Sequence, residues 1–578
     1  MTARLAPVLA LVVAGWACSA GAPGPGLDAA RAADHAAALV ALGPRPGDSP
    51  AAGSAASYLS TQLEAMGVHA EVMPVGRVEV PAREVPGVIH RASRVRDTSD
   101  PDLVVRFGPA GRALLIMAHY DTVADSPGAV DNAAAVGVLL ELARVLALAP
   151  PPQPVMLVFT ANEEIGLVGA EALAMRRGGE VRFAIALDLI GGSGPLSLNG
   201  ASRLIGRAQL AWIAAAADRA GVVVRAPLPH RVISRWWPEI ERSDHGPFTR
   251  RGIPAVHLYH RGQDGESIDL AYHSARDTAA RIDRGSLDEI GRLLRALVAR
   301  PPPVGGGDGF WLPVASNTVV PRWLLIGLDA ALAALALGLL TAMRSARTRG
   351  GLGLFAGLGC FALAAAATSA VERFAAGAHP APWLHAPAIW LAAELAVLAG
   401  ALGLATRIAG RIWPWVGERR YLAVAIALPL AVGLGWLLLG AAELAWLWLV
   451  PAAGLAVAPR LGRLGLAAIV LAVLPGALVL APDQLREAAW NGFLPTGLPL
   501  AAWLATFAAS PLAALAWWLR KAPTPGLLGG PLGTLVLPVG SGLAMVAGVA
   551  GVLHARPVCN PAEFRAFHLA CEVATRVR

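Results

Sequence analysis

Histidine and acidic residues gather in five short segments of the first half of the chain, and their types and order suit metal chemistry. In chain order the segments are His119-Tyr120-Asp121, Asp131-Asn132, Asn162-Glu163-Glu164, Asp188 and Tyr272-His273. Imidazole and carboxylate are ligands that zinc favours, and two zinc ions that share a bridging carboxylate can hold a water nucleophile and a substrate carbonyl together. The five segments therefore point to metal-assisted hydrolysis.

Two spacings within these segments separate the roles of neighbouring side chains. Glu163 and Glu164 are adjacent, so their side chains diverge, and one carboxylate can bind metal while the other stays free as a general base. His119 and Asp121 are two residues apart, which lets the carboxylate orient the imidazole without binding the metal itself.

Each of these residues, taken alone, has a more ordinary explanation. A single histidine is more often a surface or core residue than a ligand, and an aspartate after a strand often caps a helix. The glutamate pair alone also suits an exposed helix start. The conjunction favours a site, because acidic or histidine residues follow three successive apolar runs.

The elements that carry these residues alternate between strand and helix along residues 27–300. Short apolar runs predict buried strands at Ala113–Ala118, Val155–Thr160 and Phe183–Leu187. Longer runs predict helices at Leu27–Leu42, Ala51–Met66 and Ala133–Leu148. This alternation predicts an α/β domain with a mostly parallel central sheet flanked by helices, and such a sheet gathers its site at the carboxyl ends of its strands.

The same segments carry a family resemblance. Five segments, in their order along the chain, resemble the co-catalytic di-zinc aminopeptidases of metallopeptidase family 28: A-H-Y-D-T-V, P-G-A-V-D-N, F-T-A-N-E-E-I-G-L-V-G-A, L-D-L-I-G-G and Y-H-S-A-R-D-T. Residues 243–248 resemble a further segment of the family near its site. The resemblance covers about residues 27–300 and implies the zinc-aminopeptidase fold. It also implies two zinc ions per chain, with His119 and Asp188 on one zinc ion, Glu164 and His273 on the other, and Asp131 bridging both.

The resemblance further implies three catalytic roles. Glu163 acts as the general base, Asp121 orients His119, and Tyr272 donates to the tetrahedral oxyanion. One departure from the family is Val130, which stands where a second acid is common, but no ligand or base position is missing. The implied reaction is release of N-terminal amino acids from peptides. A carboxypeptidase or other amide hydrolase on the same metal site remains an alternative, as does a non-catalytic membrane receptor or transport component.

The second half of the chain is far more apolar than the first. Hydrophobic residues make up 55% of the sequence and charged residues 15%, and the charges are concentrated before residue 300. Runs near the roughly 20 residues needed to cross hydrocarbon predict an all-α membrane domain over residues 323–553. We count eight spans: Trp323–Met343, Leu352–Val371, Ala388–Ala405, Tyr421–Gly440, Ala442–Ala458, Leu464–Ala481, Leu498–Leu519 and Leu532–Leu553.

Basic residues between the runs predict a topology. Arginine or lysine clusters follow the first, third, fifth and seventh runs, at residues 344–349, 407–420, 460–463 and 520–521. Basic loops stay on the cytoplasmic side, so the peptidase half and the tail at residues 554–578 are expected outside. A disulfide between Cys559 and Cys571 would suit that oxidising side. We expect a multi-pass protein of a bacterial inner membrane.

The remaining segments and partners follow from composition. Residues 1–22 have the layout of a signal peptide or N-terminal anchor, and residues 301–322 form a Pro- and Gly-rich linker. The architecture resembles endoplasmic-reticulum metallopeptidases, in which a peptidase domain precedes a multispan domain. The net charge of +8 does not indicate nucleic-acid binding, because the arginines form no dense stripe. The expected partners are a peptide substrate and the lipid bilayer; the sequence predicts no particular protein partner.

Overall fold

The structure, a computed structural model, describes residues 26–85, 89–199, 204–226, 241–260, 271–305, 308–312, 317–342, 418–461 and 468. The predicted signal segment, the four cysteines and four of the eight predicted spans lie outside these residues, as does all but residue 468 of the sixth span.

A mixed seven-stranded sheet in the order β1-β4-β6-β5-β7-β9-β8 forms the centre of the first half. Its strands are β1 (Glu71–Val80), β4 (Arg94–Phe107), β5 (Ala113–His119), β6 (Val155–Thr160), β7 (Val181–Leu187), β8 (Leu196–Asn199) and β9 (Ala255–His260). The four inner strands β6, β5, β7 and β9 are parallel, and β1, β4 and β8 are antiparallel to their neighbours. The parallel core was predicted; the antiparallel flanks make the sheet mixed rather than mostly parallel. A small hairpin of β2 (Arg83–Val85) and β3 (Ile89–Arg91) lies apart from this sheet.

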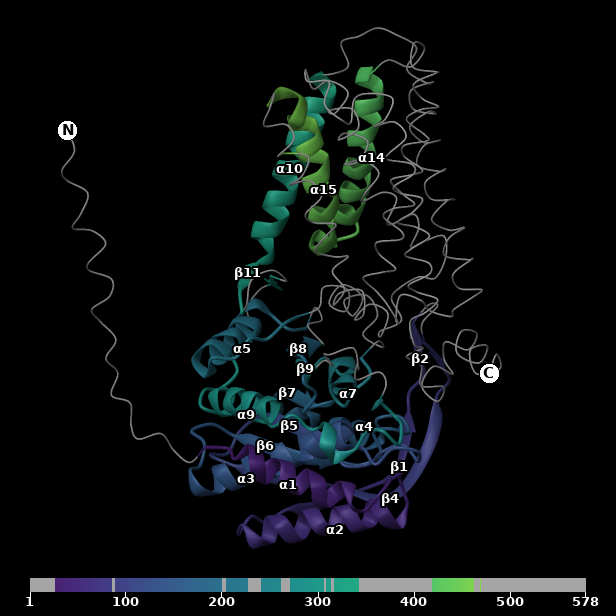
Figure 1. The fold of residues 1–578 in the computed structure, drawn as a ribbon, viewed down its shortest axis with the longest axis vertical. Coiled ribbons are helices and arrows are strands. Elements are labelled where there is room, and N and C mark those ends of the chain that lie inside the picture. The colour runs from purple at the N-terminus through teal and green to yellow at the C-terminus, as the bar shows by residue number, and fades with distance from the viewer. Residues whose placement is uncertain are drawn as a thin grey trace, which may run out of the picture.

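Helices cover both faces of the sheet (Figure 1). One face packs against α1 (Ala29–Val40), α2 (Pro50–Ala65), α3 (Ala134–Leu148), α5 (Arg207–Ala220) and α9 (Arg284–Val298). The other face packs against α4 (Val168–Arg177) and α7 (His245–Arg250). All side chains of β5, β6 and β9 are buried, because helices cover both sides of these inner strands.

Helix ends in this domain are set by local side chains. Asp28 caps α1 by accepting from the backbone N–H groups of Ala30 and Arg31, and Ser49 caps α2 with Pro50 in the first turn. Helix α3 begins directly after the segment that holds Asp131 and packs closely on α1. A Cβ at Gly137 would lie 2.1 Å from the main-chain oxygen of Ala32, so only glycine permits this approach.

Three described helices belong to the apolar second half: α10 (Arg322–Ala342), α14 (Glu418–Leu438) and α15 (Ala442–Val457). They pack together through an apolar cluster that includes Ala336, Leu430 and Leu449. Among the described residues, α10 alone has the length and apolar composition of a membrane-crossing helix, and α15 is shorter. The break at residues 439–441 separates α14 from α15 where the sequence predicted a divide between two spans.

A short hairpin of β10 (Gly309–Trp311) and β11 (Val319–Pro321) joins the two halves (Figure 1). Adjacent residues of a strand point to opposite faces, and here the two faces belong to different cores. Trp311 is buried in the core of the α/β domain, and Phe310 is buried in the cluster of helices with Leu325 and Trp448. Arg322, at the start of α10, forms a buried ion pair with Glu443 of α15 at 2.7 Å.

Candidate metal centre

The carboxyl ends of three neighbouring parallel strands bring most of the predicted site together. His119 is the last residue of β5, Glu163 and Glu164 follow β6, and Asp188 follows β7. Because β5 lies between β6 and β7, these strand ends meet at one edge of the sheet. His273, in the loop before α9, adopts a left-handed conformation with φ 52°.

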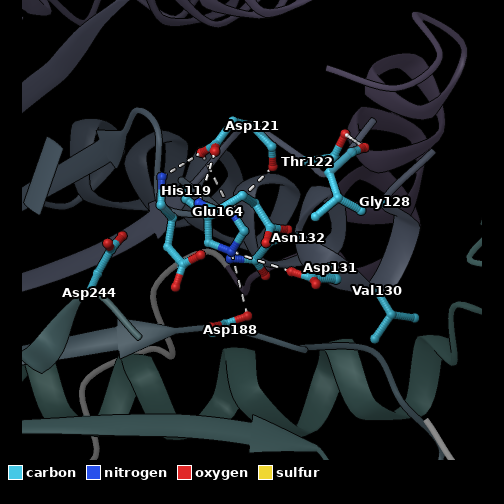
Figure 2. A network of polar contacts seen from close by, with 12 residues as sticks. His119, Asp121, Thr122, Gly128, Val130, Asp131, Asn132, Glu164, Asp188 and Asp244 are labelled. Carbon is cyan, nitrogen blue, oxygen red and sulfur yellow. Dashed lines mark hydrogen bonds and ion pairs between the residues drawn. The ribbon is translucent and has the colours of Figure 1, made fainter. Parts of the chain in front are cut away.

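Asp131 lies between the two histidines and presents a different carboxylate oxygen to each. Its Oδ1 is 3.3 Å from Nε2 of His119, and its Oδ2 is 3.1 Å from Nε2 of His273. His119 Nε2 is also 3.5 Å from Asp188, and His273 Nε2 is 2.9 Å from Glu164. Each histidine therefore has one carboxylate of its own and shares Asp131, as Figure 2 shows around His119.

The donor set fits zinc in both type and spacing. Zinc bonds to nitrogen and oxygen of about 2.0–2.1 Å at tetrahedral angles place neighbouring ligand atoms about 3.3 Å apart, which is close to the four separations above. Nε2 of His119 and Oε1 of Glu164 are buried and have no hydrogen-bond partner in the described part of the chain. A cation bound between these groups would satisfy both.

Asp121 holds neighbouring groups in place rather than joining the donor set. Nδ1 of His119 is 3.2 Å from the main-chain oxygen of Asp121 and 3.6 Å from its carboxylate. The carboxylate instead accepts from the backbone N–H groups of Glu163 at 3.0 Å and Glu164 at 3.1 Å. Asp121 thus fixes both the imidazole and the start of the glutamate pair (Figure 2).

The structure places the other two predicted residues beside this centre. Glu163, His119 and Asp188 each offer one possible metal-ligand atom, and these three atoms lie within 4.8 Å of one another. Tyr272 stacks on His273 with ring centroids 3.8 Å apart and packs against the small apolar cluster of Val130, Leu189 and Tyr259. All eight predicted site residues therefore gather at this edge of the sheet.

The concentration of carboxylates governs the protonation of the site. Burial raises the pKa of Glu163 well above its usual value, and the neighbouring carboxylates of Glu164 and Asp188 add to this. Burial, together with Asp131, raises the pKa of Glu164 to about 8. Burial also acts on Asp131, but its contacts with the two histidines outweigh it and lower its pKa. In the absence of a cation the crowded site therefore favours protonated Glu163 and Glu164, and a bound cation would favour their charged forms.

Several residues at the site had no predicted role. Asp244, which accepts a hydrogen bond from Thr160, has its pKa raised to about 7 by burial and lies beside the centre in Figure 2. Its segment had been matched to the family, which was the one signal for it. Arg45 and Asp277 are buried and contact the loops that carry the ligands. A sequence pattern does not reveal the contacts of Arg45 and Asp277, because these side chains bind main-chain groups.

Fold and site together define an α/β domain with a candidate metal centre at the carboxyl ends of its parallel strands. Residues 102–298 match the model of Peptidase family M28, so this part of the chain is a peptidase M28 family domain. The chain is 30% identical over 196 residues to aminopeptidase YwaD of Bacillus subtilis (strain 168), covering 32% of this chain and 40% of that protein. It is 41% identical over 64 residues to endoplasmic reticulum metallopeptidase 1 of Mus musculus, covering 11% of this chain and 7% of that protein.

Solved structures of aminopeptidases are similar to about half of the chain. The structure of BSAP, a zinc aminopeptidase from Bacillus subtilis, has a TM-score of 0.39 and 17% identity, covering 48% of this chain and 95% of that chain. The matched segments span well under two thirds of the length of the curated relatives, 40% for YwaD and 23% for a probable zinc metalloprotease of Pyrenophora tritici-repentis.

Proposed function

We propose that this protein is a zinc-dependent peptidase that releases N-terminal amino acids from peptides and binds two zinc ions per chain. The observation that carries the proposal is the position of Asp131, which offers one oxygen to His119 and the other to His273. His119 and Asp188 would hold one zinc ion, Glu164 and His273 would hold the other, and Asp131 would bridge them. The peptidase M28 family match supports the same class of reaction.

When bound, the two zinc ions lower the pKa of a water molecule and polarise the substrate carbonyl. Glu163 takes the proton of the attacking water on its carboxylate and passes it to the leaving amine. Tyr272, oriented by stacking on His273, donates a hydrogen bond from its hydroxyl to the developing oxyanion.

Substitution of the proposed base tests this assignment. Glu163→Gln removes the proton acceptor but keeps the size of the side chain, so kcat should fall by about 10²–10⁴-fold while two zinc ions remain bound. Glu64→Gln, on the exposed face of α2, is the matched control and should keep full activity. The assay is peptide hydrolysis by the full chain in detergent, with zinc content measured by mass spectrometry. Full activity of Glu163→Gln with two bound zinc ions would refute the role.

Blocked substrates test which terminus enters the site. Peptides with a free amino terminus should be cleaved, and the same peptides with an acetylated amino terminus should not. Cleavage of acetylated peptides that have a free carboxyl terminus would instead support a carboxypeptidase. A wild-type chain that binds two zinc ions but hydrolyses no peptide or amide in the panel would support the receptor alternative.

We also propose that the second half is a multispan membrane domain, with the peptidase domain outside the cytoplasm. The support is the membrane-crossing length and composition of α10 together with the alternation of basic loops in the sequence. A reporter that is active only after export, fused after residue 305, should be active. The same reporter fused after residue 347 should be inactive, because that loop is expected in the cytoplasm. The opposite pattern would reject this topology.

A further inference from the structure

The segment of residues 127–131, which ends at the proposed bridging ligand, departs from regular helix geometry. Gly128 is left-handed with φ 61°, and Asp131 is non-helical with φ −118° and ψ 84°. A regular helix would satisfy its own main-chain groups, whereas this segment requires partners from elsewhere in the fold. Two buried charged residues outside the proposed donor set, Arg45 and Asp277, supply them.

Asp277 binds three successive N–H groups of this segment. Its main-chain oxygen accepts from Ala129 at 3.1 Å, and its carboxylate oxygens accept from Val130 at 2.9 Å and from Asp131 at 3.0 Å. Asp277 is four residues beyond His273, so these bonds tie the loop of one proposed zinc ligand directly to the backbone of the bridging ligand.

Arg45 binds the preceding carbonyls of the same segment. Its guanidinium donates to the main-chain oxygens of Pro127 at 2.9 Å and Gly128 at 3.2 Å. The guanidinium also donates to the main-chain oxygen of Tyr120, directly after His119, at 3.0 Å. The backbone N–H of Arg45 donates to the side-chain oxygen of Thr122 at 2.8 Å, and its main-chain oxygen accepts from the N–H of Thr122 at 3.1 Å. Arg45 thus ties the loop of the other histidine to residues 127–131. Thr122 of that loop and Gly128, Val130 and Asp131 of the segment appear together in Figure 2.

The charge of Arg45 also matters. The guanidinium is fully buried and donates hydrogen bonds to main-chain carbonyls. Burial lowers its pKa to about 10, against the opposing effect of Asp121, Asp277 and Asp131, so it stays protonated at neutral pH. A fixed positive charge is therefore present beside the carboxylates of the centre.

We propose that Arg45 and Asp277 are positioning residues that hold residues 127–131 so that the two carboxylate oxygens of Asp131 face the two histidines. Together they form a bridge clamp, defined by these two side chains and the segment between them. This inference rests on the proposed function, because it assigns Asp131 as the bridging ligand. It adds that the affinity for the zinc pair depends on side chains that bind no metal.

The bridge clamp predicts a graded loss of metal affinity. Substitution of groups that orient metal ligands costs about 10–100-fold in metal affinity. Asp277→Asn keeps one side-chain acceptor oxygen and should weaken zinc binding by about 10-fold. Asp277→Ala keeps no side-chain acceptor and should weaken it by about 100-fold. Arg45→Lys keeps the charge but loses the planar fork that reaches several carbonyls, so it should also weaken binding.

Gln153 provides a matched control for loss of buried hydrogen bonds. Its amide is buried and donates to the main-chain oxygens of Leu297, Val298 and Arg300 at 2.8–3.0 Å, at the opposite ends of the strands from the site. Gln153→Met should lower the thermal midpoint, as the Asp277 variants do, but should leave zinc affinity unchanged.

The measurement is titration of the metal-free full chain in detergent with zinc against a chromogenic chelator, alongside thermal midpoints of the metal-free variants. Cobalt(II) absorption gives a second readout, because its intensity reports the ligand geometry that Asp131 sets. Wild-type zinc affinity in both Asp277 variants would overturn the bridge clamp, as would an equal loss of affinity in Gln153→Met. A wild-type chain that binds no zinc would instead overturn the proposed function itself.

Discussion

Substitution of Gly137 should break the contact between α1 and α3, although alanine normally strengthens a helix. Glycine to alanine inside a helix is worth about 1 kcal/mol in favour of alanine. At Gly137 the new Cβ would lie 2.1 Å from the main-chain oxygen of Ala32, and Cβ atoms essentially never come closer than 3.0 Å, so α1 must move away by about 0.9 Å.

The cost of this movement exceeds the gain in helix propensity. A gap of about 0.5–1 Å removes a quarter to a half of the dispersion energy of the atoms that separate, and Ala32, Ala36 and Leu39 of α1 are all fully buried. Overpacking costs about 1–3 kcal/mol, and a main-chain oxygen that cannot rotate away places Gly137→Ala at the upper end. The net loss is about 2 kcal/mol, which lowers the thermal midpoint by about 4–8 °C for a domain of this size.

Gly53 of α2 is the matched control, because it is exposed and a Cβ there would meet no atom within 4 Å. Gly53→Ala should raise the thermal midpoint by about 2–4 °C through helix propensity alone. Both variants are measured by tryptophan fluorescence during heating of the full chain in detergent. If Gly137→Ala raises the midpoint as Gly53→Ala does, the close packing of α1 on α3 is wrong.

Two further predictions concern groups away from the metal centre. Burial lowers the pKa of His35, whose Nδ1 lies 2.8 Å from the hydroxyl of Tyr58. The unfolded chain therefore takes up this proton first as pH falls below about 6.5, so stability should drop from pH 7 to 5. His35→Gln should flatten that drop in thermal midpoint, and His69→Gln, which is exposed, should not. Arg322→Met should cost about 3–5 kcal/mol by breaking the buried ion pair with Glu443. The double variant Arg322→Met, Glu443→Gln should recover part of this, and strictly additive losses in thermal midpoint would argue against the pair.

Three inner strands, β5, β6 and β7, and the proposed ligands that end or follow them were predictable because burial on both faces leaves a readable pattern. β5 and β6 are unbroken apolar runs, and the chemistry-bearing residues follow directly after them. Residues at the end of such a run can be assigned to a shared site without knowledge of distant contacts, since adjacent parallel strands bring their ends together.

The antiparallel strands β1 and β4, on one side of the sheet, could not be predicted in this way. β1 alternates between buried and exposed residues and contains Pro74 and Gly76, while β4 carries charged residues and Pro101 in its interior. Strands of this kind, with one face in solvent, are stabilised by pairing with each other, and that pairing is not visible in composition.

The bridge clamp escaped prediction for a different reason. Arg45 and Asp277 contact main-chain oxygens and N–H groups, which nearly every residue possesses, so no side-chain type at residues 127–131 indicates their partner. Asp277 stood in a segment that resembled the family, but without a role. For the membrane half the apolar runs are clear in the sequence, but most of them lie outside the described residues.

The strand β10, with Phe310 in the cluster of helices and Trp311 in the core of the α/β domain, has a consequence for how substrate reaches the centre. A domain on a flexible linker sweeps a volume and samples every orientation. A domain fixed through both faces of one strand keeps a single height and a single tilt relative to its anchor. On the proposed topology, peptides held at the bilayer would reach the centre by lateral diffusion in two dimensions. Peptides in solution would reach it only from one side.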